Sequence, residues 1–318
     1  MSTNTKGIYY STSADAPVTE EARSLALANS VPVGPNYLVN GAFDFWQRGS
    51  SFTSTAYTAD HWYCPISGGT VSPETSDLPA GFRYGIKYVS SGASQFAQFN
   101  QPIETDIMYA LRGKTVTVSG WVKITGSFSG AWVSQALYST SNDSYSSQTT
   151  SVSGSSKSVA TAATTSWTRF TNTFTIPSDA VGLRIENLPQ VAQPSGVTVR
   201  MTGLQLEEGS VATPFRRHAL SLQGEFVACQ RYYQTGGFGG TYYLGSSNGT
   251  GVGAHDYTFV PMRVSPTITN TGFTNADNAS NGGHAVISNG RVLGYYRNAN
   301  TSYPYYNFTS TFKLEAEL

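Results

Sequence analysis

The strongest constraint on this fold is a series of short segments, between about residue 36 and residue 215, in which apolar and polar residues alternate. Stretches rich in Gly, Ser and Asn separate these segments. Short alternating runs of β-branched and aromatic residues are typical of strands. The clearest are YGIKYVS (84–90), QFAQFNQPI (95–103), TVTVSGWVKI (115–124), AWVSQALYS (131–139), WTRFTNTFTI (167–176), GLRIEN (182–187) and VTVRMTGLQLE (197–207). Such a succession, with no helix between the strands, predicts a β-sandwich. The alternation changes phase near Gly120, which predicts a bulge or a bend there.

The remainder of the chain adds two short helices and a second group of strands. Residues 1–35 are polar and contain one helical stretch, VTEEARSLALANS (18–30), which is too short to be stable alone and so needs a partner. Residues 216–233 predict a connecting helix. Residues 234–318 begin with a glycine-rich stretch and continue as strands, with a two-residue hairpin turn at Ser288-Asn289-Gly290. We therefore expect an all-β protein with a smaller C-terminal β domain.

The connecting helix carries one narrow apolar stripe. Leu222, Phe226, Cys229 and Tyr233 fall on one face at helical spacing. A stripe of this width resembles the seam of a coiled coil. The stripe predicts that the chain associates with copies of itself.

Composition excludes several classes of protein. Lys+Arg and Asp+Glu number 19 each, so the chain lacks the basic excess that nucleic-acid binding requires. No apolar run is long enough to span a bilayer, and the first residues lack the apolar core of a secretory signal. Two distant cysteines, Cys64 and Cys229, predict buried free thiols. The 20 Tyr and many Gly, Ser and Asn residues suit an uncharged adhesive surface or an aromatic β core.

No catalytic motif withstands a test of its context. GSSNG (245–249) matches a nucleophile elbow but lacks the helix that should follow it. The four histidines have no neighbouring ligands at zinc spacing. A glycosidase needs two facing carboxylates, and the close pairs Glu104/Asp106 and Glu207/Glu208 do not suit that role. We predict no catalytic residue and no metal ligand, although a carboxylate pair joined from distant segments stays possible.

One stretch carries a family resemblance. NYLVNGAFDFWQRGSSFTSTAYTADHWY (36–63) resembles the opening of the carbohydrate-binding-module-like jelly rolls of phage tail fibres, as do GLQLEEGSVATPF (203–215), CQRYY (229–233) and VPMRVSPTIT (260–269). The likeness covers residues 36–318. It implies a jelly roll at 36–215, a receptor-binding tip at 234–318 and a homotrimer. It also implies a virion protein, assembled in the host cytoplasm, whose residues 1–35 bind the tail or baseplate and which acts outside the cell.

The motif also suggests local contacts. In an extended strand Phe43 and Phe45 would share the core face, and Arg48 would lie beside Asp60 under Trp46 and Trp62. We expect this cluster to be structural. No cofactor is expected, although a structural calcium ion, as in some modules of this kind, would use Asn40 or Asp44 with Glu208.

The expected activity is adhesion to a host surface glycan, without catalysis or membrane insertion. Tyrosine rings can cover a sugar ring while polar side chains bond its hydroxyls. We place this site in the C-terminal tip, at Phe238, Tyr242, Tyr243, His255, Asp256, Tyr257, Tyr295, Tyr296, Tyr303, Tyr305 and Tyr306. Two alternatives remain: a tailspike-type enzyme that degrades the glycan, and a purely structural fibre or decoration protein.

Overall fold

The computed structural model divides into two units, Met1–Gly34 and Pro35–Leu318. It describes the backbone of residues 2–3, 9–10, 35–243, 252–277, 279–288, 290–298 and 305–318, and the side chains of 35–237, 257–269, 290–292 and 311–318. In the first unit only the short paired strands β1 (Ser2–Thr3) and β2 (Tyr9–Tyr10) are described. The helix expected at 18–30 lies outside the described residues.

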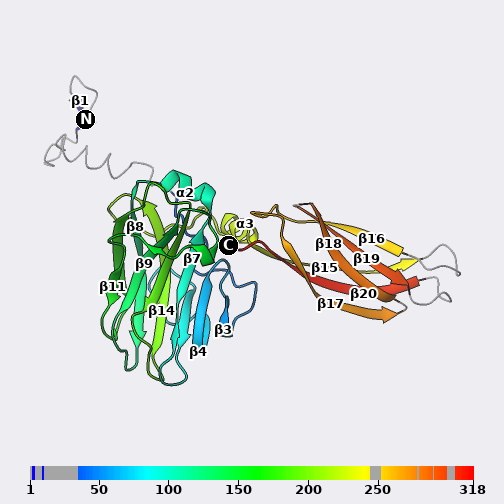
Figure 1. Cartoon of the computed structure of the whole chain (residues 1–318), viewed down its shortest axis with the longest axis horizontal. Coiled ribbons are helices and arrows are strands. Elements are labelled where there is room, and N and C mark those ends of the chain that lie inside the picture. Colours follow the sequence, from blue (N-terminus) through cyan, green and yellow to red (C-terminus); the bar gives the residue numbers. More distant parts are fainter. Residues whose placement is uncertain are drawn as a thin grey trace. The chain divides into compact units, whose positions relative to one another are not determined.

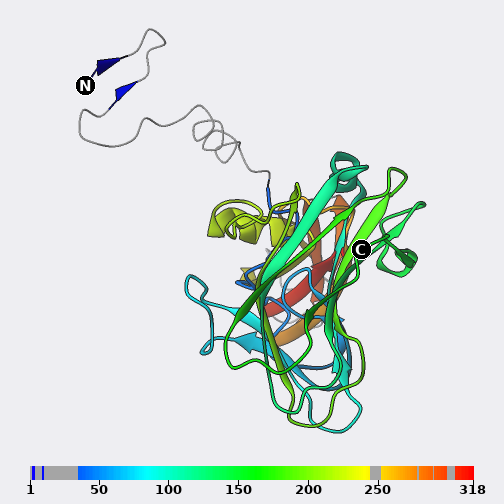
Figure 2. The same cartoon turned by 90° about the vertical axis from the view of Figure 1, so that its left-hand side faces the viewer.

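The first part of the second unit is an antiparallel β-sandwich (Figure 1). Its strands are β3 (Phe52–Tyr57), β4 (Tyr63–Glu74), β5 (Gly85–Val89), β6 (Phe96–Ala97), β7 (Phe99–Ile103), β8 (Thr115–Thr125), β9 (Trp132–Ser139), β10 (Thr150–Ser151), β11 (Lys157–Ala160), β12 (Thr168–Thr175), β13 (Gly182–Pro189) and β14 (Thr198–Glu208). Their hydrogen-bonded order is β10-β9-β13-β7-β4-β5-β14-β8-β12, with β11 on β9 and with β3 and β6 on β4. Figure 2 shows that strands from early (blue to cyan) and late (green) parts of the sequence lie side by side.

Strand β4 belongs to both layers of the sandwich. Its first residue, Tyr63, pairs with Asn100 of β7, and its second half pairs with β5. Between these halves Gly68 and Gly69 both have φ of +78°, a left-handed conformation that glycine adopts without steric cost. The chain bends there, so β4 passes from the β7–β13–β9 layer to the β5–β14–β8–β12 layer.

The core lies between these layers and follows the predicted alternation. In β12 the inward Phe170 and Phe174 are buried while the residues between and beside them face solvent, apart from the buried Asn172. The bulge or bend expected near Gly120 is found as a register shift between β8 and β14. Thr202 lies opposite Trp121 and Gln205 opposite Ser119, so the extra residue is on β14 across from Gly120, whereas β8 pairs with β12 without interruption. Cys64 and Cys229 are free and buried, as predicted.

The described helices are short. They are α2 (Thr105–Leu111), the 3-10 turn η1 (Tyr145–Ser147) and α3 (Leu222–Gln230), and none of the described helices is long and apolar enough to cross a membrane. The helix predicted over 216–233 thus begins later, after Ser221, whose hydroxyl accepts a hydrogen bond from the Gly224 amide.

The apolar stripe of α3 packs within its own chain. Phe226 packs against Phe45 of the sandwich at 5.0 Å between ring centroids, and Cys229 and Tyr233 are buried. These three side chains are therefore not free to form a seam with another copy. Only Leu222, the first residue of the stripe, is exposed.

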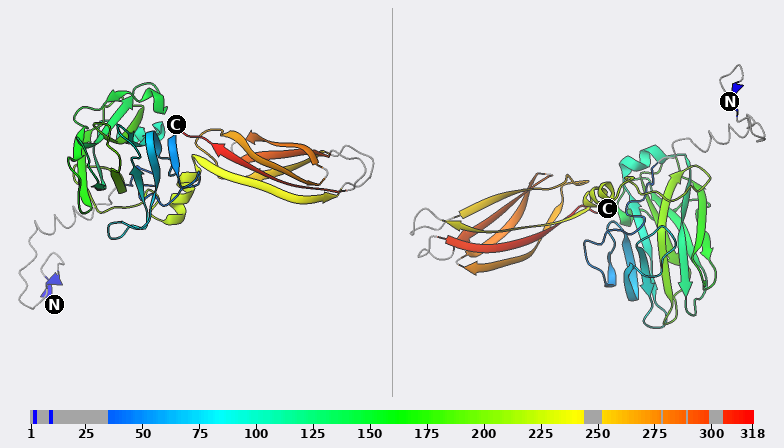
Figure 3. Two further views of the ribbon diagram at one scale, coloured as in Figure 1. Left: turned by 90° about the horizontal axis from the view of Figure 1, so that it is seen from below. Right: turned by 180° about the vertical axis from the view of Figure 1, so that it is seen from behind.

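The C-terminal part contains β15 (Tyr233–Tyr243), β16 (Val252–Thr258), β17 (Thr267–Asp277), β18 (Ala279–Ser288), β19 (Arg291–Asn298) and β20 (Tyr305–Glu315). They form two three-stranded sheets, β15-β20-β17 and β16-β19-β18 (Figure 3). The predicted hairpin is confirmed, because Ser288 lies opposite Arg291 and Gly290 has φ of +109°. The all-β class with a sandwich and a smaller second β group is thus confirmed.

The prediction that residues 36–49 form a strand is wrong. The backbone there turns, with positive φ at Asn40 and Phe43, and the first strand of the sandwich begins at Phe52. Phe43 packs against Trp62, whereas Phe45 packs against α3. The two phenylalanines therefore have different environments instead of sharing one strand face.

Candidate functional site

One outer face of the sandwich gathers polar and aromatic side chains. Strand pairing sets four residues in a row across β4, β7, β13 and β9, and these are Tyr63, Asn100, Glu186 and Gln135. Alternation places the buried Leu183 and Ile185 of β13 in the core, so Glu186 and its neighbour Arg184 point away from it. We call this surface the β13 face.

A charged pair occupies the middle of the β13 face. Arg184 Nε lies 2.8 Å from Glu186 Oε1, and Gln135 donates a 2.7 Å hydrogen bond to the other carboxylate oxygen. Arg184 and Glu186 are only 8% and 4% exposed although they point away from the core. A charged pair so shielded from water keeps a fixed geometry, because any unpaired charge there would be costly.

The segment that contains η1 covers this pair. The Tyr145 ring lies 4.0 Å from the Arg184 guanidinium carbon, and the carbonyl of Tyr145 accepts a 2.6 Å hydrogen bond from the same side chain. The Tyr145 hydroxyl accepts a 2.9 Å hydrogen bond from Asn100, and its ring lies 4.3 Å from that of Tyr63. Burial raises the pKa of Tyr145, so the hydroxyl stays protonated.

A third tyrosine extends the aromatic group. The ring of Tyr57 meets that of Tyr63 edge-on at 5.1 Å between centroids. Asn100 Oδ1 is buried and has no hydrogen-bond partner in the part of the chain that the structure describes. Tyrosine rings beside amides and a guanidinium group offer both the flat apolar surface and the hydrogen bonds that a sugar ring requires.

Of the residues predicted for the C-terminal tip, only Tyr257 has a described side chain. It is half-buried, packs edge-on against Phe312 at 5.4 Å and contributes to a small core. Nine others lie on described strands but their side chains are outside the described residues: Phe238, Tyr242, Tyr243, His255, Asp256, Tyr295, Tyr296, Tyr305 and Tyr306. Tyr303 lies entirely outside them. The backbone register sets Tyr242 opposite Tyr306 and Tyr243 opposite Tyr305.

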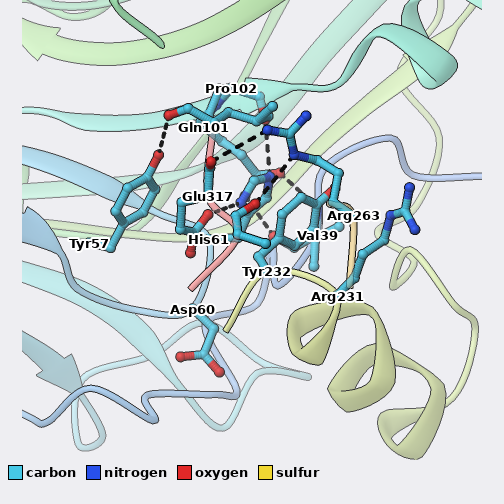
Figure 4. Close-up of polar contacts among 12 residues, drawn as sticks. Val39, Tyr57, Asp60, His61, Gln101, Pro102, Arg231, Tyr232, Arg263 and Glu317 are labelled. Carbon is cyan, nitrogen blue, oxygen red and sulfur yellow. Dashed lines mark hydrogen bonds and ion pairs between the residues drawn. The ribbon is translucent and has the colours of Figure 1, made fainter. Parts of the chain in front are cut away.

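A second polar cluster joins the sandwich to the end of the chain (Figure 4). Glu317 accepts a 2.8 Å hydrogen bond from Arg48 and lies 2.7 Å from His61 Nδ1. The other ring nitrogen of His61 lies 3.1 Å from the carbonyl of Pro102. Both ring nitrogens of His61 therefore face oxygen acceptors. Its ring stacks on Tyr232 at 3.6 Å.

The expected pairing of Arg48 with Asp60 is therefore wrong. Asp60 accepts hydrogen bonds from the backbone and side chain of Gln47 instead, at 2.9 and 2.6 Å. The Arg48 guanidinium group lies 3.8 Å from the ring of Tyr233, the first residue of β15. The motif thus has the structural role that was expected. The partners of Arg48, however, are Tyr233 and Glu317, which are so distant in sequence that spacing could not reveal them.

Other polar groups, both near this cluster and elsewhere in the sandwich, are also paired. Glu104 accepts two 2.9 Å hydrogen bonds from Arg231 and one of 3.0 Å from Tyr232. The three suggested calcium ligands have separate partners: Asp44 pairs with Arg217, Glu208 with Lys114, and Asn40 bonds to backbone carbonyls. Over the side chains that the structure describes, no cluster of three His, Cys, Asp or Glu could hold a metal.

The residues of the β13 face were not selected from the sequence. The available signal was the charged pair Arg184 and Glu186, which alternate with apolar Leu183 and Ile185 in GLRIENLP. Tyr63 and Tyr145 gave no such signal, since their contact depends on how the loop before β10 folds back.

Comparison with known proteins bears on this domain. Residues 35–188 match the model of a family described as a carbohydrate binding domain, which is somewhat under half of the chain. A comparison with curated proteins gave no match. The matched segment includes β4, β7, β9 and β13, and a carbohydrate binding domain is thereby supported for the sandwich.

Several solved structures align with about half of the chain. The enzymatically active domain of tailspike protein 4 of Bacteriophage CBA120 aligns at 14% identity and a TM-score of 0.38, over 55% of this chain and 21% of that one. A putative sugar binding protein from Bacteroides thetaiotaomicron aligns at 13% identity and 0.37, over 55% and 100%. A structure described as "CBM4 structure and function" aligns at 19% and 0.32, over 54% and 98%. The chain thus spans about a fifth of the tailspike chain.

Proposed function

We propose that this protein is a non-catalytic adhesin whose sandwich binds a cell-surface glycan on the β13 face. The observation that carries the proposal is the grouping of Tyr63, Tyr145 and Asn100 around a buried ion pair, on a domain that matches a carbohydrate binding model. Aromatic faces stack on sugar rings, and the surrounding amides can bond hydroxyl groups.

The carboxylate on this face supports binding over hydrolysis. A glycosidase flanks the scissile bond with two carboxyl groups, one of which donates a proton. Glu186 is instead engaged on both oxygens by Arg184 and Gln135. A tailspike-type enzyme remains the alternative, and release of reducing sugars from host envelope would favour it.

We further propose that the protein is a phage tail fibre, or receptor-binding protein, that acts as a homotrimer outside the cell. The sequence resemblance over 36–318 supports this, and residues 1–35 would attach to the tail or baseplate. Single sites for neutral sugars are weak, with dissociation constants of about a millimolar, and several copies per particle would raise the avidity. The C-terminal tip, where the sequence places the receptor site, stays a prediction, and on this proposal it would be a further receptor contact.

The experiment is to measure binding of host surface polysaccharide to the intact protein and to variants of the β13 face. Tyr63→Ala should weaken binding about tenfold, because a stacking surface is lost. Tyr109→Ala is the matched control, since this tyrosine is exposed on α2. Equal binding by all three proteins would exclude the β13 face, and Tyr242→Ala/Tyr306→Ala would then test the tip. No binding by the intact protein to host envelope would favour a purely structural fibre.

A further inference from the structure

We propose that the tyrosines of the β13 face are positioned by the last three residues of the chain and by Arg263, so that glycan binding and docking of the C-terminal strands are coupled. The glycan part of this inference rests on the proposed function. Arg263 is a positioning residue here, because it contacts the segment that carries Tyr145 and not the face itself.

The first connection runs through Tyr57. Its ring packs against Tyr63, and its hydroxyl donates a 3.0 Å hydrogen bond to the carbonyl of Leu318. Burial raises the pKa of Tyr57 far above its ordinary value, so the hydroxyl remains a donor. The edge of the aromatic group is thus fixed to the last residue of the chain.

The second connection runs through Arg263, which precedes β17. Its guanidinium group lies 3.3 Å from Asp143 Oδ2 and donates to the carbonyls of Ala316 and Glu317 at 3.3 and 3.5 Å. Asp143 directly precedes the segment that presents Tyr145, and the same carboxylate oxygen accepts from the Thr105 amide at 3.0 Å. Arg263 therefore links the Tyr145 segment to the end of the chain.

The end of the chain is itself firmly held. Glu317 lies between Arg48 and His61, and Ala316 donates its amide to the carbonyl of Tyr232 at 2.9 Å. Detaching Glu317 would leave the largely buried Arg48 guanidinium group and the buried His61 ring without this partner, which is strongly unfavourable. When residues 316–318 are docked in this way, they hold Tyr57 through Leu318 and the Tyr145 segment through Arg263.

Coupling follows from these connections. A glycan that stacks on Tyr63 and Tyr145 binds the docked state more tightly than an undocked one, so its binding stabilises docking. The effect is reciprocal. Loosening residues 316–318 must lower the affinity for the glycan by the same factor by which the glycan favours docking. Glycan binding to the sandwich would thereby hold the C-terminal strands more firmly against it.

The test uses the full chain with Arg263→Gln and Tyr57→Phe, which keep bulk but remove the two connections. Arg83→Gln and Tyr109→Phe are matched controls at exposed sites on other segments. Without ligand, hydrogen exchange should accelerate at residues 143–149 in Arg263→Gln but not in the controls. Unchanged exchange there would overturn the positioning role whatever the protein binds.

Binding then tests the coupling. Both variants should bind host polysaccharide about fivefold or more weakly than the controls, and polysaccharide should slow exchange at residues 312–318 of the unaltered protein. Wild-type affinity in both variants would overturn the coupling. If the unaltered protein binds no polysaccharide, the proposed function and the coupling both fail, while the exchange result still decides the positioning.

Discussion

At the scale of single residues, the aromatic motif near the start of the sandwich is structural and not a ligand platform. Trp62 is fully buried, packs 5.0 Å from Phe43 and donates a 3.1 Å hydrogen bond to the carbonyl of Asn40. Trp62→Ala should lower the free energy of unfolding by about 3–5 kcal/mol. Trp46→Ala, at a half-buried ring, should cost clearly less. Denaturant unfolding compares the two, and equal losses would contradict this account of the core.

The carboxylate of Glu317 should make stability depend on pH. Burial alone would raise its pKa, but His61 and Arg48 outweigh burial and hold the pKa below the ordinary value of 4.5. The native state therefore favours the ionised form. This contribution is fully present above about pH 4.5 and is lost as the pH falls through the lower native pKa. Asp60, whose pKa burial raises, acts in the opposite direction.

Glu317→Gln isolates this term, because Asp60 and the other groups are common to both proteins. At pH 7 the variant should be less stable by about 3–5 kcal/mol, since the largely buried Arg48 guanidinium group loses its charged partner. The difference in unfolding free energy between the two proteins should shrink below pH 4.5. A difference that stays constant from pH 7 to pH 3 would show that Glu317 is not stabilised as an anion.

At the scale of elements, alternation predicted the strands well where each strand has one buried face. The segment TRFTNTFT forms β12 with the expected faces because local sequence and burial agree there. The motif at 36–49 also alternates aromatics, yet it forms turns because the side chain of Asn40 bonds to the backbone of Phe45 and Asp60. Such competition by a polar side chain cannot be read from periodicity. The same holds for α3. Its apolar stripe suggests contact with another chain, and only the structure shows that Phe45 of the same chain covers it.

Gly41 marks a place where two elements approach too closely for any side chain. A Cβ atom there would lie 2.0 Å from the backbone oxygen of Leu204 in β14. At Gly120 the corresponding obstacle, at 2.5 Å, is the end of the flexible Leu204 side chain. Gly41→Ala should therefore lower the melting temperature much more than Gly120→Ala, which should cost about 1–3 kcal/mol. The reverse order in thermal unfolding would argue against this packing of the motif on β14.

At the scale of the whole molecule, the sequence predicted the sandwich, the second β group and the carbohydrate-binding type of domain, but not the β13 face. Tyr63, Asn100 and Arg184 come from three strands, and Tyr145 comes from a loop that folds over them. These residues lie close together because of the order of the strands in the sheet, and strand order cannot be predicted from a local sequence pattern. The tip shows the opposite case. Its many tyrosines suggested a binding site, but Tyr257, the one predicted site residue with a described side chain, packs against a small core.

The predicted homotrimer now depends on exposed residues at and just before α3, of which only Leu222 belongs to the stripe that first suggested it. Leu220 and Leu222 are 78% and 50% exposed at the start of α3, and Val227 is exposed on the same helix. Contiguous exposed apolar patches mark association surfaces, and the prediction is that these three residues meet another copy of the chain. Light scattering after size exclusion should give about three times the chain mass of 34.1 kDa. Leu220→Glu/Val227→Glu should dissociate the assembly without changing the melting of the sandwich, whereas Val191→Glu, on an exposed loop, should not. A monomeric wild-type protein at micromolar concentration would contradict the trimer, and a double variant that remains trimeric would move the interface away from α3.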